Sequence, residues 1–77
     1  MPVHNEDIAT VFDEVADLLE IEGDNPFRIR AYRNGARTLR GLGQDVHTLI
    51  ERGEDITRLS GIGTNLAAKI HEILDTK

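Results

Sequence analysis

Residues 59–64 read Leu-Ser-Gly-Ile-Gly-Thr, and this short stretch decides how the chain folds. Two glycines separated by one residue allow the backbone a positive φ angle or a close approach to another surface. Ile62, between them, can fill the gap between two packed helices. Thr64 can cap the helix that follows. The stretch therefore predicts a tight turn between two helices, with the amides of Gly63, Thr64 and Asn65 facing outward at the positive end of the second helix.

Apolar residues recur at three- and four-residue spacing on both sides of this turn, which is typical of amphipathic helices. After the turn, the apolar positions are Leu66, Ile70, Ile73 and Leu74. Before it, they are Ile8, Val11, Phe12, Val15, Leu18 and Leu19 in a first segment and Ile29, Tyr32, Ala36 and Leu39 in a second. No segment shows the period of two that marks a strand. The chain is therefore predicted to be all-α, a compact bundle of four to five short helices.

Capping residues and glycines give the expected ends of these helices. The residues expected to begin helices are Asn5, Asn25 with Pro26, Val46, Asp55 and Thr64. Those expected to end them are Gly23, Gly41 with Gly43, and Gly53. The helix that Asp55 caps is a single turn over residues 56–58. Gly35 lies inside the second helix, where glycine costs about 1 kcal/mol relative to alanine, so it indicates that another element packs closely there.

The composition excludes several classes of protein. The 77 residues make one small domain. Cysteine is absent, which excludes disulfides and thiolate zinc sites, and the three histidines lack the spacing of metal ligands. No apolar run approaches the roughly 18 to 20 residues that a membrane helix needs, and the first residues do not form a signal peptide. We therefore expect a cytoplasmic, monomeric domain with no membrane partner.

The net charge of −5, from 9 Lys+Arg and 14 Asp+Glu, hides a strong segregation. Residues 1–24 hold eight acids and no lysine or arginine, whereas residues 25–44 hold five arginines and no acid. Because a ligand senses charge over about 8 to 10 Å, the acidic total does not exclude nucleic acid. Three of the arginines that follow the apolar stripe of the second helix have two open interpretations, as phosphate contacts or as partners of acids in the first helix: Arg30, Arg37 and Arg40.

The aromatic residues are expected to lie mainly inside the bundle. Phe12 and Phe27 are assigned to the core, and Tyr32 to the inner stripe of the second helix with its hydroxyl at the edge. His71 is expected to lie on an exposed flank.

Residues 59–70, Leu-Ser-Gly-Ile-Gly-Thr-Asn-Leu-Ala-Ala-Lys-Ile, resemble the helix-hairpin-helix motif of many DNA repair and replication proteins. Together with residues 25–33, Asn-Pro-Phe-Arg-Ile-Arg-Ala-Tyr-Arg, they are similar to the amino-terminal domain of family X DNA polymerases, most closely the bacterial and archaeal branch. The resemblance covers about Asn5 to Thr76. It implies a single domain over residues 1–77, with the helix-hairpin-helix motif at about 55–76.

The resemblance also implies a function. Such a domain binds DNA without reading its sequence, at gaps and 5′-phosphate ends, as part of a polymerase in DNA repair, including base excision repair. The polymerase residues themselves would lie beyond residue 77, and the ending Asp75-Thr76-Lys77 suggests an excised domain. The residues expected to contact DNA are Gly61, Gly63, Thr64, Asn65, Arg28, Arg33 and Arg58. No cofactor is required, although the family places a Na⁺ or K⁺ ion on carbonyls that correspond to Thr57, Leu59 and Ile62.

Three positions depart from the family pattern. Asn65 replaces a phosphate-binding lysine of an animal member of the family, and Phe27 stands where that member has a histidine. Ser60 replaces the usual proline of the turn. These changes weaken the expectation of strong phosphate binding and leave the expected fold unaltered.

Some family members also remove a 5′-deoxyribose phosphate by a lyase reaction, and the resemblance assigns Lys69 as the lysine that forms the Schiff base, with Tyr32 in the same pocket. An amine of ordinary pKa, near 10.4, is almost fully protonated at neutral pH, so this role needs partial burial or a neighbouring cation such as Arg28. The alternative is a routine surface pair between Lys69 and Glu72, which are three residues apart on a helix.

Three functions therefore remain open at this point. The first is a DNA-binding module of a family X polymerase, and the second is the same domain with lyase activity through Lys69. The third is a protein-interaction domain whose acidic first helix meets a basic partner.

Overall fold

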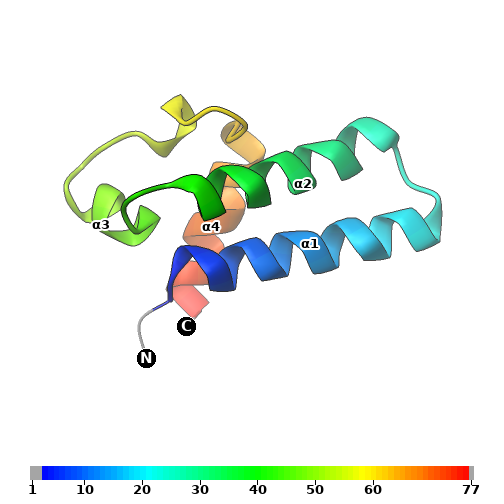
Figure 1. Cartoon of the computed structure of the whole chain (residues 1–77), viewed down its shortest axis with the longest axis horizontal. Helices are drawn as coiled ribbons and strands as arrows, with labels where there is room; N and C mark the ends of the chain where they lie inside the picture. Colours follow the sequence, from blue (N-terminus) through cyan, green and yellow to red (C-terminus); the bar gives the residue numbers. More distant parts are fainter. Residues whose placement is uncertain (1–2, 77) are drawn as a thin grey trace.

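Two long antiparallel helices form the body of the molecule, and the remaining elements pack on them (Figure 1). This computed structural model describes residues 3–76. The helices are α1 (Asn5–Glu22), α2 (Pro26–Gly41), α3 (Val46–Glu51) and α4 (Thr64–Thr76), with a 3₁₀ turn η1 (Ile56–Arg58) before α4. Residues 3–76 contain no strand, so the predicted all-α class and the number of helices are confirmed.

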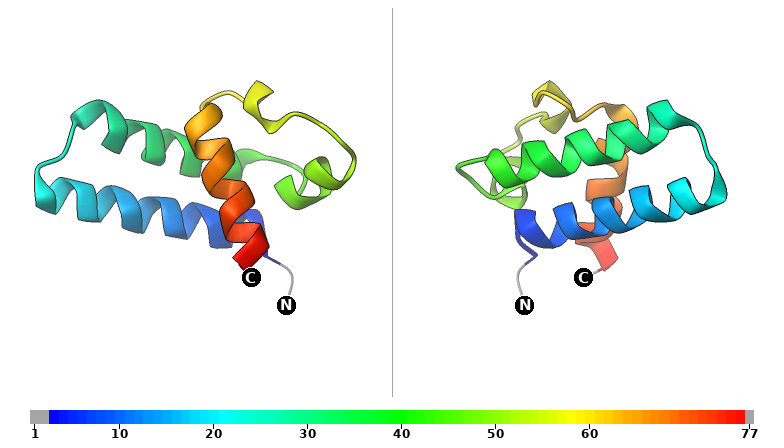
Figure 2. Two further views of the ribbon diagram at one scale, coloured as in Figure 1. Left: turned by 180° about the vertical axis from the view of Figure 1, so that it is seen from behind. Right: turned by 45° about the vertical axis from the view of Figure 1, so that its right-hand side comes forward.

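Helix α4 crosses both members of the α1–α2 pair, as the view from behind shows most clearly (Figure 2). Helix α3 and η1 lie beyond the end of the pair where α1 begins and α2 ends. The opposite end of the pair, where α1 passes into α2, projects beyond α4 and is not covered by another element.

The core forms where α1, α2 and α4 meet. Phe12 and Tyr32 are both buried, and their rings pack edge to face with centroids 5.4 Å apart. The predicted core positions of both residues are therefore confirmed. The other buried apolar residues are Ile8, Ala9, Ala16, Leu19, Ala36, Leu39, Val46, Ile56, Ile62, Leu66, Ala67 and Ile70.

Gly35 explains how the three helices approach so closely. A methyl group on this residue would lie 2.7 Å from Cδ1 of Leu66 on α4 and 3.3 Å from Cδ2 of Phe12 on α1. The first distance is too short for two carbon atoms, and the second is tighter than an ordinary van der Waals contact. The close packing that the sequence predicted at Gly35 is therefore present, and it involves both neighbouring helices.

Most of the predicted helix ends are confirmed. Gly23 ends α1 with a φ angle of 72°, and the side chain of Asn25 accepts a hydrogen bond from the amide of Phe27 (2.9 Å) at the start of α2. Asp55 caps η1 by accepting hydrogen bonds from Thr57, first from its hydroxyl and then from its amide, and these bonds lower the pKa of Asp55 below its ordinary 3.8. The ionised form therefore stabilises the fold at neutral pH, and this contribution is lost as the pH falls through the lowered pKa.

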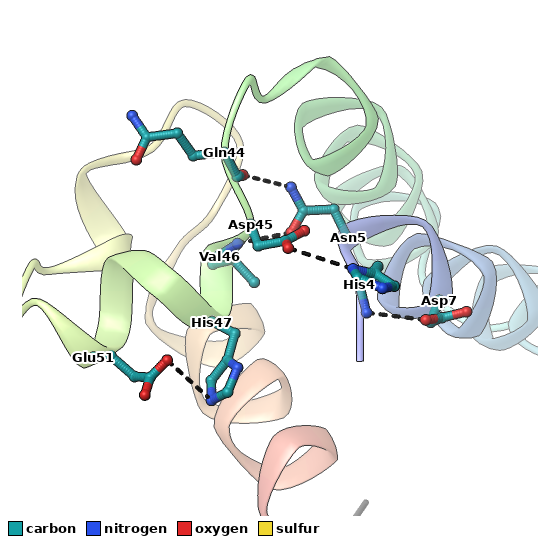
Figure 3. Close-up of polar contacts among 8 residues, drawn as sticks. All are labelled: His4, Asn5, Asp7, Gln44, Asp45, Val46, His47 and Glu51. Atoms are coloured by element: carbon teal, nitrogen blue, oxygen red, sulfur yellow. Dashed lines mark hydrogen bonds and ion pairs between the residues drawn. The ribbon is translucent and has the colours of Figure 1, made fainter. Parts of the chain in front are cut away.

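The prediction that Asn5 caps α1 is wrong. The cap of α1 is His4, whose amide donates to the carboxylate of Asp7 (2.9 Å), and Asn5 is the first helical residue. Asn5 is buried, and its side-chain amide donates to the carbonyl of Gln44 (2.8 Å) and accepts from the amide of Val46 (2.8 Å) (Figure 3). Val46 begins α3, so Asn5 satisfies an end group of a helix 41 residues away along the chain.

Replacing Asn5 by alanine should therefore lower the free energy of unfolding by about 2 kcal/mol, because it leaves the buried N–H of Val46 and the part-buried carbonyl of Gln44 without their partners. Asn5→Asp keeps the acceptor for Val46 but places a carboxylate oxygen against the carbonyl of Gln44, so it should not restore the lost stability at neutral pH. Urea denaturation followed by circular dichroism measures both values. A loss below about 0.5 kcal/mol for Asn5→Ala would show that these bonds do not hold α3 in place.

Candidate nucleic-acid interface

The turn that joins η1 to α4 has the geometry that its glycines predicted. The amide of Ile62 donates to the carbonyl of Leu59 (3.0 Å), and Gly61 between them has a φ angle of 82°. Ile62 is only 2% exposed and fills the gap between η1 and α4, as the sequence indicated. This helix-hairpin-helix turn therefore has a fixed shape.

The turn is also fastened to α2. The hydroxyl of Thr38 donates to the carbonyl of Ser60 (2.6 Å). A methyl group on Gly61 would lie 2.8 Å from the same hydroxyl oxygen and 3.4 Å from the carbonyl oxygen of Asn34. Gly61 thus meets both conditions that favour glycine, a positive φ angle and a close neighbour.

The second glycine of the turn faces open space. A methyl group on Gly63 would meet no atom within 4 Å, and Gly63, Thr64 and Asn65 are all exposed. The predicted cap is off by one residue: Thr64 is already helical, and the carbonyl of Gly63 accepts the first helical hydrogen bond, from Ala67 (2.9 Å). Within residues 3–76, the main-chain N–H groups of Gly63, Thr64 and Asn65 donate to no protein acceptor. They stand at the positive end of α4, where an anion is stabilised.

The structure brings Arg28, Tyr32 and Lys69 together around a groove of about 280 Å³. Its apolar floor includes Val11 and Val15 of α1. A second groove, of about 510 Å³, shares Arg28, Tyr32 and Lys69 and extends along α4 to Asn65 at the hairpin. The predicted lysine site and the predicted hairpin site are therefore parts of one continuous surface.

Lys69 lies at the edge of both grooves. Its side chain is 51% exposed, and its Nζ atom lies 3.6 Å from Oε2 of Glu72. Glu72 lines both grooves as well. The surface pair that the sequence offered as an alternative is therefore present, and it lies beside Tyr32 in the groove.

Two arginines of the stripe turn away from this surface toward α1. Arg33, expected among the DNA contacts, donates hydrogen bonds to Glu20 and Asp17, which raise the pKa of its guanidinium. Arg40 donates to Glu6 (3.0 Å) and Asp13 (2.7 Å), which likewise raise its pKa. The structure selects ion pairing for Arg40 and does not bring Arg33 to the groove. The six side chains that make these contacts lie on the opposite edge of the helix pair from Lys69, because helical periodicity places Arg33 about 140° around α2 from Arg28.

The remaining arginines make weaker ion pairs or none among the described residues. Arg28 lies 3.5 Å from Asp24 and is largely exposed, and the guanidinium of Arg30 lies 5.9 Å from the ring centre of Phe27. Within residues 3–76, Arg37 and Arg58 have no carboxylate oxygen within 4.0 Å. The positive charge that remains available therefore lies at the start of α2, on its outer face and beside the hairpin.

The assignment of Phe27 to the core is wrong, because its side chain is 73% exposed. Phe27 belongs to the first turn of α2. It borders the groove that contains Asn65 and Lys69. Helical periodicity was the signal that sequence reasoning could have used, because Phe27 lies two residues before Ile29, about 160° around the helix axis from the apolar stripe.

Three main-chain carbonyls were expected to hold a monovalent cation, and His71 was expected to be exposed. Thr57 lies in η1, and Leu59 and Ile62 lie in the turn that follows it. The carbonyl of Leu59 already accepts one hydrogen bond from Ile62 and keeps a second lone pair. His71 is exposed, as expected. Residues 3–76 contain no cluster of three or more side chains suited to hold a metal ion, and no helix among them is long and apolar enough to cross a membrane.

The comparisons with known proteins agree with this architecture. A family model described as a helix-hairpin-helix domain matches residues 3–77, so the chain belongs to the helix-hairpin-helix domain family. The chain is 37% identical over 73 residues to the DNA polymerase/3′-5′ exonuclease PolX of Bacillus subtilis (strain 168). This match covers 95% of the chain and 12% of the relative, and it supports the resemblance to family X DNA polymerases. No solved structure gives a significant match.

Gly61→Ala should destabilise the domain through both strain and steric overlap. Gly53 is a matched control, because it has nearly the same φ angle (81°) and no atom within 4 Å of an added methyl group. An alanine costs roughly 1 to 2 kcal/mol in this backbone conformation at either site. Urea denaturation should therefore show that Gly61→Ala costs at least about 1 kcal/mol more than Gly53→Ala. Equal losses would mean that the turn is not packed against α2.

Proposed function

We propose that this domain binds DNA without reading its sequence and serves as a DNA-binding part of a family X DNA polymerase. The membership in the helix-hairpin-helix family and the similarity to a PolX protein support this assignment. The single observation that carries it is the N-terminus of α4. There, main-chain N–H groups of Gly63, Thr64 and Asn65 are free and exposed beside a groove that contains Arg28 and Lys69.

The geometry suits a DNA backbone because it combines two kinds of phosphate contact. Main-chain N–H groups at a helix N-terminus bind a phosphate oxygen without regard to the base attached. Arg58 precedes the turn, and Arg28 and Lys69 lie along the groove on its other side. Successive phosphates of one strand could therefore contact the hairpin and then the groove.

We further propose that the domain favours gaps with a 5′-phosphate, in the setting of DNA repair. A strand end places a terminal phosphate and an exposed sugar together, and the groove pairs cationic side chains with the apolar floor at Val11 and Val15. The exposed ring of Phe27 offers a flat surface on which an unpaired base can stack. Intact duplex offers neither a terminal phosphate nor an unstacked base.

Few phosphates should be neutralised, because Arg33 and Arg40 are already paired. About three contacts predict that log Kd against log salt concentration has a slope of magnitude about 2 to 3. Arg58→Gln should reduce this magnitude by about 1. Arg52→Gln removes the same charge near α3 and should leave the slope unchanged. Fluorescence anisotropy with gapped, 5′-phosphorylated DNA measures the slope, and equal binding of intact duplex would remove the proposed preference for gaps.

Phe27→Ala should weaken binding to gapped DNA about tenfold, because stacking on one base contributes about 1 to 3 kcal/mol. Its midpoint of thermal unfolding should stay within about 2 °C of the parent, because the ring packs against no core residue. Ile21→Ala, which also removes an exposed apolar side chain, is the control and should bind DNA normally. An equal loss of affinity in both variants would exclude a stacking role for Phe27.

Lyase activity on a 5′-deoxyribose phosphate is a second candidate, favoured by the position of Lys69 beside Tyr32 and Arg28 at one apolar groove. The uncharged amine of Lys69 would add to the sugar aldehyde and release water, forming an imine. The phenol of Tyr32 and the guanidinium of Arg28 would hold the sugar phosphate in the groove.

Borohydride should reduce such an imine to a stable covalent adduct between the chain and DNA that carries a 5′-deoxyribose phosphate. Lys69→Ala should abolish the adduct, which gel electrophoresis detects. Lys77→Ala removes the other lysine of the chain and should leave the adduct intact. An adduct that survives Lys69→Ala would remove Lys69 from this role.

A further inference from the structure

Two large aliphatic side chains on α1 lie uncovered on the surface. Leu18 is 60% exposed and Ile21 is 82% exposed. They are three residues apart on one helix, so their side chains are neighbours. Neither belongs to the core or packs against it. They lie in the last part of α1, where the helix pair projects beyond α4 (Figure 1).

The fold does not explain these two residues. Single exposed apolar residues are common, whereas contiguous exposed apolar patches rimmed by polar residues mark contact surfaces. The other exposed large apolar residue, Phe27, belongs to α2 and borders the groove of the proposed DNA interface. Leu18 and Ile21 line neither groove that contains Lys69.

Apart from Asp7, which accepts a hydrogen bond from the amide of His4, the carboxylates of α1 separate into two groups around this pair. One group is neutralised by Arg33 and Arg40 of α2, and its members are Glu6, Asp13, Asp17 and Glu20. Glu14 and Glu22 lie one turn before and one turn after Leu18, and within residues 3–76 neither has a cationic nitrogen within 4.0 Å. At 100° per residue, Glu14 also lies within about 40° of both aliphatic side chains around the helix axis.

We propose that Leu18 and Ile21, bordered by Glu14 and Glu22, form a docking face for a protein segment that presents apolar side chains between basic residues. The carboxylates of Glu14 and Glu22 favour a cationic partner. Leu18 and Ile21 favour a partner with apolar side chains at the centre of the contact. DNA and anionic lipid are repelled by the same carboxylates. A second copy of this chain would bring two sets of free carboxylates together. This proposal is independent of the proposed DNA interface, which uses other residues.

A synthetic helical peptide with leucines along one face and lysines on both sides of that face is a suitable probe. Titrated into the ¹⁵N-labelled chain, it should shift the amide signals of residues 14–22 most strongly. Leu18→Ser/Ile21→Ser should weaken its binding at least tenfold while the rest of the spectrum is retained, because these side chains do not contribute to the core. Phe27→Ser, which removes an equally exposed apolar group elsewhere, should not alter the affinity.

A second pair of variants separates this docking face from general attraction to an acidic chain. Glu14→Gln/Glu22→Gln should weaken binding of the leucine–lysine peptide and make its affinity less dependent on salt concentration. Glu51→Gln/Glu54→Gln removes the same charge near α3 and should have little effect. The proposal is overturned if a peptide with alanine in place of leucine binds as well, if the two carboxylate pairs behave alike, or if the shifts centre outside residues 14–22.

Discussion

The close approach of α4 and its preceding turn to α2 is the constraint on which the rest of the structure depends. It rests on two glycines, each placed where a single methyl group would overlap a neighbouring element. Because Gly35 has no side chain, Leu66 and Phe12 can lie close to the backbone of α2. Because Gly61 has none, Thr38 can lie close to the turn. Because both ends of this contact are fixed, the N-terminus of α4 and the side chain of Lys69 have set positions relative to Arg28 and Tyr32.

The two long helices carry charges of opposite sign. Helix α1 carries only acids among its charged residues, and it binds Arg33 and Arg40 of the basic stripe along one edge of the pair. Within residues 3–76, Arg30 and Arg37 of α2 and Arg58 beside the hairpin have no carboxylate oxygen within 4.0 Å, so they are available to a ligand. An acidic chain can therefore present a local cationic surface, because charges of opposite sign are sorted onto different sides of the same pair of helices.

Local sequence signals predicted most of the fold because they act within one helical turn. Asn25 with Pro26, Gly23 and the apolar stripes around Phe12 and Tyr32 are of this kind. Asn5 could not be assigned correctly from local rules, because its partners lie about 40 residues away. Phe27 is apolar but lies off the stripe of Ile29 and Tyr32, so helical periodicity does not support its assignment to the core. The arginines of α2 share one periodicity, so only the packing angle of α1 separates those that are paired from those that are free.

The double hydrogen bond of the Asn5 side chain has a consequence for how the molecule opens. Helix α3 is a short segment of six residues that could not persist alone in water, and the amide at its beginning is held by the first helical residue of α1. Fraying of the first turn of α1 would therefore release the α3 region in the same event. The two segments form one cooperative unit of local unfolding, separate from the grooves, so exchange of the Val46 amide with solvent reports on the first turn of α1.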